Sequence, residues 1–261
     1  MAKYLRCRWY AGWLTILASL FCLNGAAYAD LAETVQRIKT SILIVGTYKP
    51  MGSPQFALRG TGFVIGDGNL AVTNAHVLAA ASGAVSNETG GGLVVQVRNS
   101  NGELNMRRAI AIAIDKTHDL ALLKFDGPAV PKLSIRDSST VREGDAIAFI
   151  GFPIGGALGY APVTHRGIIS SITPIALPAT TANKLNEKVV QRIKDGIFNI
   201  YQLDATAYPG NSGGPVFDPE TGQVIGVINM IFVKSTKEAA LSQPSGITYA
   251  IPASFIAGLL R

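Results

Sequence analysis

Short apolar segments, each bounded by turn-forming residues, recur along most of the chain and limit the folds it can adopt. Examples are SILIVGTY, GLVVQVRNSNGELN and QVIGVINMIFV, which are rich in the β-branched and aromatic residues typical of strands. Gly-Asp-Gly-Asn at 66–69 and Asn-Ser-Asn-Gly at 99–102 are hairpin signals. Many short strands at roughly regular spacing indicate β-barrels or β-sandwiches rather than βαβ units. The sequence therefore predicts an all-β protein.

Three segments depart from the strand pattern. Residues 31–39 carry Leu31, Val35 and Ile38 at helical spacing, which predicts a short N-terminal helix. Segment 183–198 repeats apolar residues at every fourth position between charged ones. This predicts a helical insertion, which we expect to pack on the body of the protein rather than to bind a partner. The last residues, ASFIAGLLR, are expected to form a C-terminal helix.

The stretch GPAVPKLS, at 127–134, contains two prolines and no apolar periodicity. It predicts a connection between two folded units, which we place at residues 30–130 and 131–261. The chain has 261 residues, of which 48% are apolar and only 15% are charged. It is therefore long enough to bury a sizeable core and does not have the composition of a disordered protein.

The first 29 residues have the three parts of a secretory signal peptide. Lys3, Arg6 and Arg8 form a basic start, the apolar run WYAGWLTILASLFCL follows, and Ala-Tyr-Ala at 27–29 offers a cleavage site. We expect cleavage after Ala29, which would leave no stable membrane anchor. The alternative is an uncleaved anchor, for which the apolar run is short.

Both cysteines, Cys7 and Cys22, lie within this predicted signal, so the processed chain would form no disulfide. An exported domain of this size without disulfides fits the bacterial periplasm first and secretion second. Processing would also lower Lys+Arg from 23 to 20 against 17 Asp+Glu, a net charge of +3 in place of +6. Such a small excess does not indicate a nucleic-acid partner.

Ser212, in YPGNSGGPVF, is the first candidate for chemistry. It is surrounded by Gly210, Gly213 and Gly214, which is more glycine than one turn requires. A serine hydroxyl becomes a good nucleophile only when a base removes its proton, and imidazole is the usual base. Among the three histidines, His76 follows an apolar strand and has small neighbours that leave room around its ring.

A histidine that acts as a base needs a carboxylate on its other ring nitrogen, to fix the tautomer and stabilise the imidazolium. Asp119 opens the apolar run DLALLKF, at the edge of a predicted strand, and can point inward. His118 would point to the opposite face of an extended segment and is the poorer candidate. Taken singly, each residue has a structural explanation as a core histidine, a cap or a turn. The combination of His76, Asp119 and Ser212 is more specific.

These residues lie in motifs that resemble a known family. TNAHV, HDLALLKF and GNSGGPVF, in the order His–Asp–Ser, resemble the trypsin/chymotrypsin clan of serine proteases. GTGFVIGDGNLAVTNAHV, IGFPIGGALGYAPVTHRGIISSI, LDATAYPGNSGGPVFD and GQVIGVINM are similar to successive motifs of its bacterial HtrA (Deg) subgroup. The resemblance covers nearly all of residues 31–256. It implies two packed six-stranded antiparallel β-barrels, with His76 and Asp119 in the first and Ser212 in the second.

The resemblance also implies a role for each residue. His76 is the general base and then the general acid, Asp119 orients it, and Ser212 attacks the scissile carbonyl to form an acyl-enzyme. The N–H groups of Gly210 and Ser212, on either side of Asn211, form the oxyanion hole. No metal or cofactor is expected.

The implied function is an exported serine endopeptidase that cleaves unfolded or misfolded proteins, with protein or peptide substrates. Two alternatives remain open. One is a binding or chaperone module with a protease-like fold. Such a module is expected to lack a triad residue, and this sequence has all three. The other is a latent protease that requires substrate or a partner for activation.

The same resemblance implies which residues form the S1 pocket. Thr206, six positions before Ser212, falls at the base of the S1 pocket, where it offers no carboxylate to a basic P1 residue. Asn229, Met230 and Ile231 match the strand that lines the substrate and the pocket wall. We therefore expect small to medium uncharged P1 residues.

Two departures from the family pattern qualify these expectations. In the digestive enzymes, an aspartate just before the nucleophile pairs with a new amino terminus, but this chain has Asn211 there. We therefore expect no activating cleavage near ILIVGT at 42–47. HtrA proteases usually continue into PDZ domains, and no PDZ domain is expected in this sequence, which ends at Arg261. The trimer that the subgroup often forms is left open.

Overall fold

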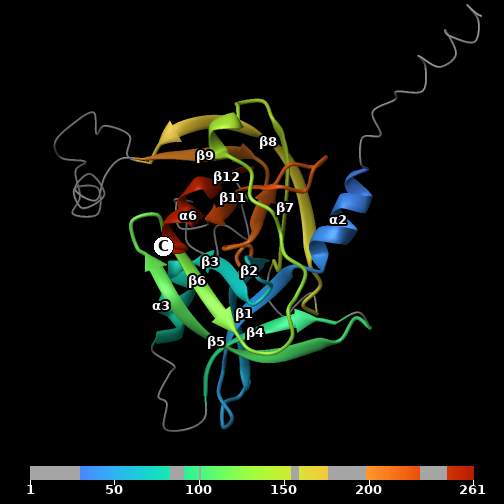
Figure 1. Ribbon diagram of the computed structural model, residues 1–261, viewed down its shortest axis with the longest axis vertical. Coiled ribbons are helices and arrows are strands. Elements are labelled where there is room, and N and C mark those ends of the chain that lie inside the picture. Colours follow the sequence, from blue (N-terminus) through green and yellow to red (C-terminus); the bar gives the residue numbers. More distant parts are fainter. Residues whose placement is uncertain (1–29, 83–90, 100, 154–158, 176–197, 230–245) are drawn as a thin grey trace, which may run out of the picture.

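The computed structural model describes residues 30–82, 91–99, 101–153, 159–175, 198–229 and 246–261. The described strands form two closed antiparallel barrels of six strands each, which lie one above the other in Figure 1. This arrangement confirms the predicted all-β fold and its two-barrel form.

The first barrel has the strand order β1-β2-β3-β6-β5-β4. Its strands are β1 (Ile42–Tyr48), β2 (Phe56–Ile65), β3 (Leu70–Asn74), β4 (Gly92–Arg98), β5 (Leu104–Asp115) and β6 (Leu120–Phe125). The second barrel has the order β10-β11-β12-β9-β8-β7. Its strands are β7 (Ala146–Gly151), β8 (Val163–Pro174), β9 (Asn199–Asp204), β10 (Pro215–Phe217), β11 (Val224–Asn229) and β12 (Ile247–Pro252).

Both predicted hairpins of the first barrel are present. Residues 66–69 connect β2 to β3, and residues 99–102 lie between β4 and β5. Gly66 and Gly68 have φ values of 65° and 97°, a left-handed conformation that glycine adopts without the penalty of a Cβ atom. The turn residues of the sequence thus determine where these strands pair.

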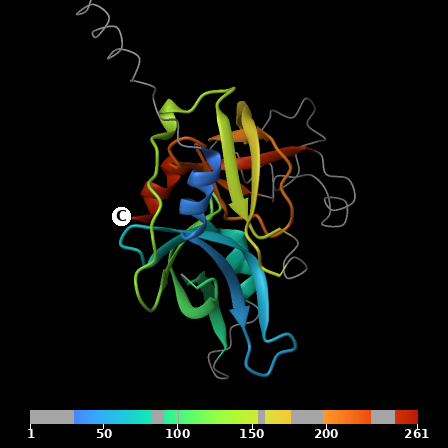
Figure 2. The ribbon, with the colours of Figure 1, turned by 90° about the vertical axis from the view of Figure 1, so that its right-hand side faces the viewer.

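The predicted N-terminal helix is α2 (Leu31–Lys39). The Asp30 carboxylate caps it by accepting a hydrogen bond from the Ala32 N–H, and Thr34 and Ile38 are buried on its inner face. The Arg37 guanidinium donates to the Thr221 carbonyl in the second barrel. The helix therefore packs where the two barrels meet, as the view onto it shows (Figure 2).

The C-terminal residues also form the predicted helix, as a 3₁₀ turn η5 (Ala253–Phe255) followed by α6 (Ile256–Leu259). Two elements were not predicted: α3 (Ala75–Ser82), where an alanine-rich segment follows β3, and the 3₁₀ turn η2 (Ser138–Thr140). The predicted helical insertion at 183–198 lies outside the described residues, except for its last residue. No helix in the described part of the chain has the length and apolar character needed to cross a membrane.

An apolar cluster between the barrels fixes their packing. It joins Phe63 and Leu122 of the first barrel to Ile150 and Phe217 of the second, and all four side chains are buried. Each barrel has a further core of its own. Close packing of this kind leaves little freedom for relative motion, so side chains that face one another across the barrel boundary keep a defined geometry.

A histidine–aspartate pair closes the turn between β5 and β6. Nδ1 of His118 lies 2.5 Å from Oδ2 of Asp115, and the ring stacks on Phe255 with centroids 3.8 Å apart. His118 thus lies in a turn rather than on the far face of an extended segment. Partial burial raises the pKa of the Asp115 carboxyl, but hydrogen bonds from His118 and Thr117 outweigh it and hold the pKa below 3.8.

Asp115→Asn should lower the free energy of unfolding near pH 7 by up to about 1 kcal/mol, a figure that allows for solvent screening of a partly exposed pair. Folding lowers this pKa, so the contribution is fully present above the unfolded value, about 3.9. It is lost as the pH falls through the lower folded value. Urea denaturation at pH 7 and at pH 2.5 to 3, roughly one unit below the unfolded value of about 3.9, measures the difference.

The matched control is Asp126→Asn, which changes an exposed carboxylate that has no partner among the described residues. It should leave the free energy of unfolding almost unchanged at both pH values. A loss for Asp115→Asn that does not shrink at low pH would contradict the assignment.

Candidate active site

The predicted site residues come from segments that meet at the boundary between the barrels. His76 is the second residue of α3, directly after β3, and Asp119 lies in the turn just before β6. Ser212 lies in the turn before β10 of the second barrel. Asn229 ends β11, and its amide Nδ2 donates to Oδ2 of Asp119 over 2.7 Å. The second barrel thus contacts the carboxylate of the first directly.

Asp119 holds His76 through both of its carboxylate oxygens. Oδ1 accepts a hydrogen bond from the His76 backbone N–H at 2.8 Å, and Oδ2 lies 2.6 Å from Nδ1 of the ring. Because Nδ1 donates to the carboxylate, Nε2 is the nitrogen left with a lone pair. The structure therefore brings His76 and Asp119 together in the orientation that a general base requires.

The backbone at Asp119 is held equally firmly. Its carbonyl accepts from the Ala75 N–H at 3.1 Å and from Nδ2 of Asn74 at 3.0 Å. Asp119 itself has a φ of 53°, in the left-handed region that aspartate tolerates better than most residues. These contacts join the start of α3 to the turn before β6 at the position of the carboxylate.

Asn229 has a contact that the sequence analysis did not foresee. Its predicted place in the substrate-lining strand and the S1 pocket stays a prediction, and its buried side chain also donates to Asp119. The available signal was an amide at the end of the apolar run VIGVIN, because a buried polar side chain needs a hydrogen-bond partner. Sequence alone did not identify that partner, which is 110 residues away.

The turn that carries Ser212 is tied to the first barrel. The Ser212 carbonyl accepts from the Thr61 N–H at 2.8 Å, and the Thr61 hydroxyl donates to the Gly210 carbonyl at 2.7 Å. Gly213 has a φ of 86°, and a Cβ atom there would collide with the Thr61 carbonyl oxygen. The glycine directly after the serine therefore serves a close approach of two backbones, not flexibility.

Two backbone N–H groups of this turn are free to donate a hydrogen bond to a substrate. The Asn211 N–H donates to the Tyr208 carbonyl and the Gly214 N–H to the Asn211 carbonyl. The N–H groups of Gly210 and Ser212 have no acceptor within the described residues. Gly210 has a φ of 104°, a backbone conformation that a residue with a Cβ atom rarely adopts. Unengaged donors on both sides of one residue are what an oxyanion hole requires.

Ser212 approaches the end of α3 that carries His76. A Cβ atom on Gly60 would lie 2.7 Å from the Val77 side chain and 2.8 Å from the Ser212 carbonyl, so both flank the same glycine. Ser212 is buried, with 5% of the residue exposed. The Ser212 hydroxyl makes no hydrogen bond to His76 in the described structure, a contact that often tightens only when substrate binds.

The remaining predicted site residues are only partly described. Thr206 is half-buried between β9 and the Ser212 turn, and the neighbouring Ala207 N–H donates to the Thr248 hydroxyl of β12. Met230 and Ile231 lie outside the described residues, so the predicted S1 wall stays a prediction. No group of three or more His, Cys, Asp or Glu in the described segments is placed to hold a metal ion.

Comparison with known proteins gives a consistent result. A family profile described as trypsin-like peptidase domain matches residues 60–227. A "Probable periplasmic serine endoprotease DegP-like" of Halomonas elongata is 31% identical over 193 residues, which are 74% of this chain and 32% of that protein. The mitochondrial serine protease HTRA2 of Drosophila grimshawi is 31% identical over 248 residues, 93% of this chain and 49% of the relative.

Among solved structures, the HtrA-type protease AlgW with a tripeptide superposes with a TM-score of 0.60 at 25% identity. The match covers 88% of this chain and 62% of that one. The chain thus spans about a third to a half of the two curated relatives and less than two thirds of this solved structure.

The contact between Asn229 and Asp119 leads to a prediction. Removing a hydrogen bond to a charged group costs about 1.5–3 kcal/mol, which corresponds to about a ten- to 100-fold slower reaction if Asp119 orients the base. Asn229→Ala should therefore slow the reaction of Ser212 with a fluorophosphonate by about that factor. Labelling rates on the intact chain measure it.

Thr206→Ala is the comparison variant, because it alters the predicted S1 pocket and leaves Asp119 untouched. It should label at nearly the wild-type rate with a small probe. If Asn229→Ala labels at the wild-type rate while its preference among peptides changes, Asn229 acts in the pocket wall and not on Asp119.

Proposed function

The chain belongs to the trypsin-like peptidase family, and on this basis we propose that it is a serine endopeptidase of the HtrA type, with His76, Asp119 and Ser212 as its catalytic residues. One observation carries the proposal: Asn229, Asp119 and His76 form a continuous hydrogen-bonded chain at the boundary between the barrels, where the Ser212 turn is tied to Thr61 of the first barrel. The carboxylate lies next to the imidazole, which is the arrangement that acyl transfer requires when the imidazole takes a proton and becomes positively charged.

Acylation begins when Oγ of Ser212 attacks the carbonyl carbon of the scissile peptide bond. Nε2 of His76 takes the hydroxyl proton as the C–O bond forms, and the Asp119 carboxylate stabilises the imidazolium without taking the proton itself. The carbonyl oxygen becomes an anion and accepts hydrogen bonds from the N–H groups of Gly210 and Ser212. Because these donors are already oriented, little reorganisation is needed when the charge develops.

Breakdown of the tetrahedral intermediate reverses the role of His76. The imidazolium gives its proton to the leaving amine, the C–N bond breaks, and the acyl group stays on Ser212 as an ester. A water molecule then attacks the ester while His76 takes its proton. That proton returns to Oγ of Ser212 as the carboxylic acid product leaves, so the enzyme is regenerated.

Export is a second part of the proposal. It is supported by the basic start, apolar run and Ala-Tyr-Ala site of residues 1–29, and by the periplasmic name of the DegP-like relative. Other relatives are named as mitochondrial, so the names alone do not decide the compartment. The substrates we propose are exported proteins that are unfolded or misfolded, cut after small to medium uncharged residues.

The latent form of this protease is the second candidate. It is favoured by one observation, the missing hydrogen bond between the Ser212 hydroxyl and His76. Against it, the N–H groups of Gly210 and Ser212 already lack other acceptors in the described structure. A constitutively active protease would need no activator, whereas a latent protease would require one.

The proposal predicts covalent labelling of one serine. The full chain should react with a fluorophosphonate and should cleave a denatured protein such as unfolded casein, whereas Ser212→Ala should do neither, because the nucleophile is gone. Mass spectrometry of the labelled peptide and gel-based cleavage assays provide the two readouts.

Ser139→Ala is the matched control, because it removes the hydroxyl of an exposed serine in η2. It should label and cleave as the wild type does. Labelling that survives in Ser212→Ala would remove Ser212 from its role. No labelling of the wild type, with or without denatured protein as an activator, would overturn the enzyme proposal itself.

A further inference from the structure

The side chain of Asn211 lies at a critical place, since the residue separates the two candidate oxyanion donors. Asn211 is completely buried, and its Oδ1 has no hydrogen-bond partner in the described structure. A Cβ atom on Gly151 would lie 2.6 Å from that oxygen, so the absence of a side chain there makes room for the amide. The other end of the amide, Nδ2, lies 3.4 Å from Nε2 of His165.

His165 is itself fixed in position by the second barrel. It belongs to β8 and pairs across the sheet with Phe149 of β7. The two rings stack with centroids 4.6 Å apart and an angle of 16° between their planes. On the side of the Ser212 turn, the Tyr208 ring lies with its centroid 6.1 Å away. The imidazole therefore points at Asn211 from a rigid support.

Asn211 can pass this restraint to its neighbours because its backbone is held as well. Its N–H donates to the Tyr208 carbonyl at 3.0 Å, and its carbonyl accepts from the Gly214 N–H at 2.9 Å. With the side chain also held, the peptide planes on both sides of Asn211 have defined orientations. The plane after Asn211 carries the Ser212 N–H, and the plane before it carries the Gly210 carbonyl, so that the orientation of Gly210, and with it the Gly210 N–H one plane further on, is restrained as well.

We propose that His165 is a positioning residue, which holds the Asn211 amide and so keeps the N–H groups of Gly210 and Ser212 aimed at the oxyanion; this inference rests on the proposed function. In the digestive enzymes that the sequence resembles, an aspartate at this place pairs with a new amino terminus. In this chain a neutral amide and an imidazole from its own strand β8 make the contact.

The charge state of His165 follows from its surroundings. The described groups that face the ring are Phe149, the Asn211 amide and Tyr208, and none of them is a carboxylate or a basic side chain. Burial lowers the pKa of His165 below 6.5. The ring is therefore neutral at pH 7, and Nε2 can accept a hydrogen bond from the Asn211 amide.

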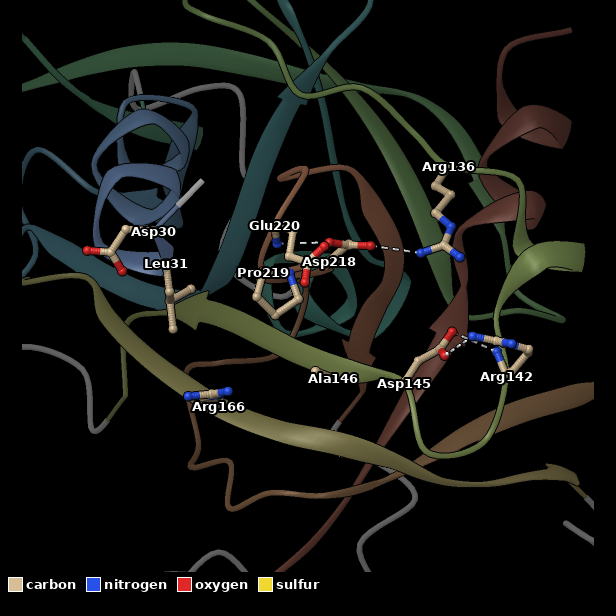
Figure 3. Close-up of a pocket in the computed structure, with 10 residues that line it drawn as sticks. All are labelled: Asp30, Leu31, Arg136, Arg142, Asp145, Ala146, Arg166, Asp218, Pro219 and Glu220. Atoms are coloured by element: carbon tan, nitrogen blue, oxygen red, sulfur yellow. Dashed lines mark hydrogen bonds and ion pairs between the residues drawn. The ribbon is translucent and has the colours of Figure 1, made fainter. Parts of the chain in front are cut away.

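The neighbouring charge on β8 points elsewhere. Successive side chains of a strand face opposite sides, and Arg166 lines a surface cleft together with Asp145 and Asp218 (Figure 3). Asp145 is paired there with Arg142, and Asp218 with Arg136. This cleft is on the outer side of the barrel, so its charges do not contact the imidazole of His165.

Two substitutions separate the hydrogen bond from the packing. His165→Phe keeps an aromatic ring against Phe149 but has no nitrogen, and it should lower kcat for a peptide substrate by about 10- to 100-fold, part of the effect of losing one oxyanion donor, with KM within about twofold. His165→Gln retains a group that can contact the amide and should keep kcat within about threefold of wild type. Thermal unfolding of each variant reports whether the fold is intact.

A double-variant cycle tests whether His165 acts through Asn211. Asn211→Ala should lower kcat by a factor similar to that of His165→Phe, and the double variant should lose little more, because both remove one contact. Arg166→Gln, on the opposite face of the same strand, is the matched control and should keep kcat within about twofold.

A titration by NMR gives a readout that does not depend on catalysis. The His165 ring should titrate below pH 6.5 in the wild type. Asn211→Asp should raise that pKa by placing a carboxylate beside the ring. A pKa that does not respond, or folded His165→Phe with wild-type kcat, would overturn the inference while leaving the peptidase standing. A wild-type chain that cleaves nothing would instead overturn the proposed function, and the positioning role with it.

Discussion

The carboxylate of Asp119 is the group on which the rest of the site depends. It accepts hydrogen bonds from the backbone and ring of His76 in its own barrel and from Asn229 of the other barrel. A buried amide and a partly buried carboxylate would be costly if unpaired, so the contact between them favours one relative placement of the barrels. The position of the base is therefore coupled to the packing of the whole molecule, and not only to the turn that carries Asp119.

The Ser212 turn is fixed in a complementary way. Its backbone belongs to the second barrel but contacts Thr61 of the first through two hydrogen bonds, and Gly213 allows that approach. The apolar cluster that joins Phe63 to Phe217 supports both sides of this contact. The base and the nucleophile thus reach the barrel boundary from different barrels, and each is anchored to the barrel opposite.

Much of this organisation could be predicted from the sequence, because it depends on local patterns. Strand alternation, the glycine-rich hairpins and the spacing of Leu31, Val35 and Ile38 each reflect neighbouring residues. The contacts that the sequence did not reveal join distant segments. Asn229 contacts Asp119 across 110 residues, and His165 contacts Asn211 across 46 residues. The helix α3 was missed because an apolar, alanine-rich run after β3 fits a strand end as well as a helix.

The most direct test of this account is the rate of acylation of Ser212 in the variant Asp119→Asn. An amide in place of the carboxylate favours the wrong tautomer of His76, and this change costs about 10,000-fold in triads of this kind. Single-turnover acylation by an activated ester substrate at pH 7, with circular dichroism to verify the fold, measures the effect. A folded variant slowed by about that factor would support the central role of Asp119. A folded variant within about tenfold of the wild type would contradict it.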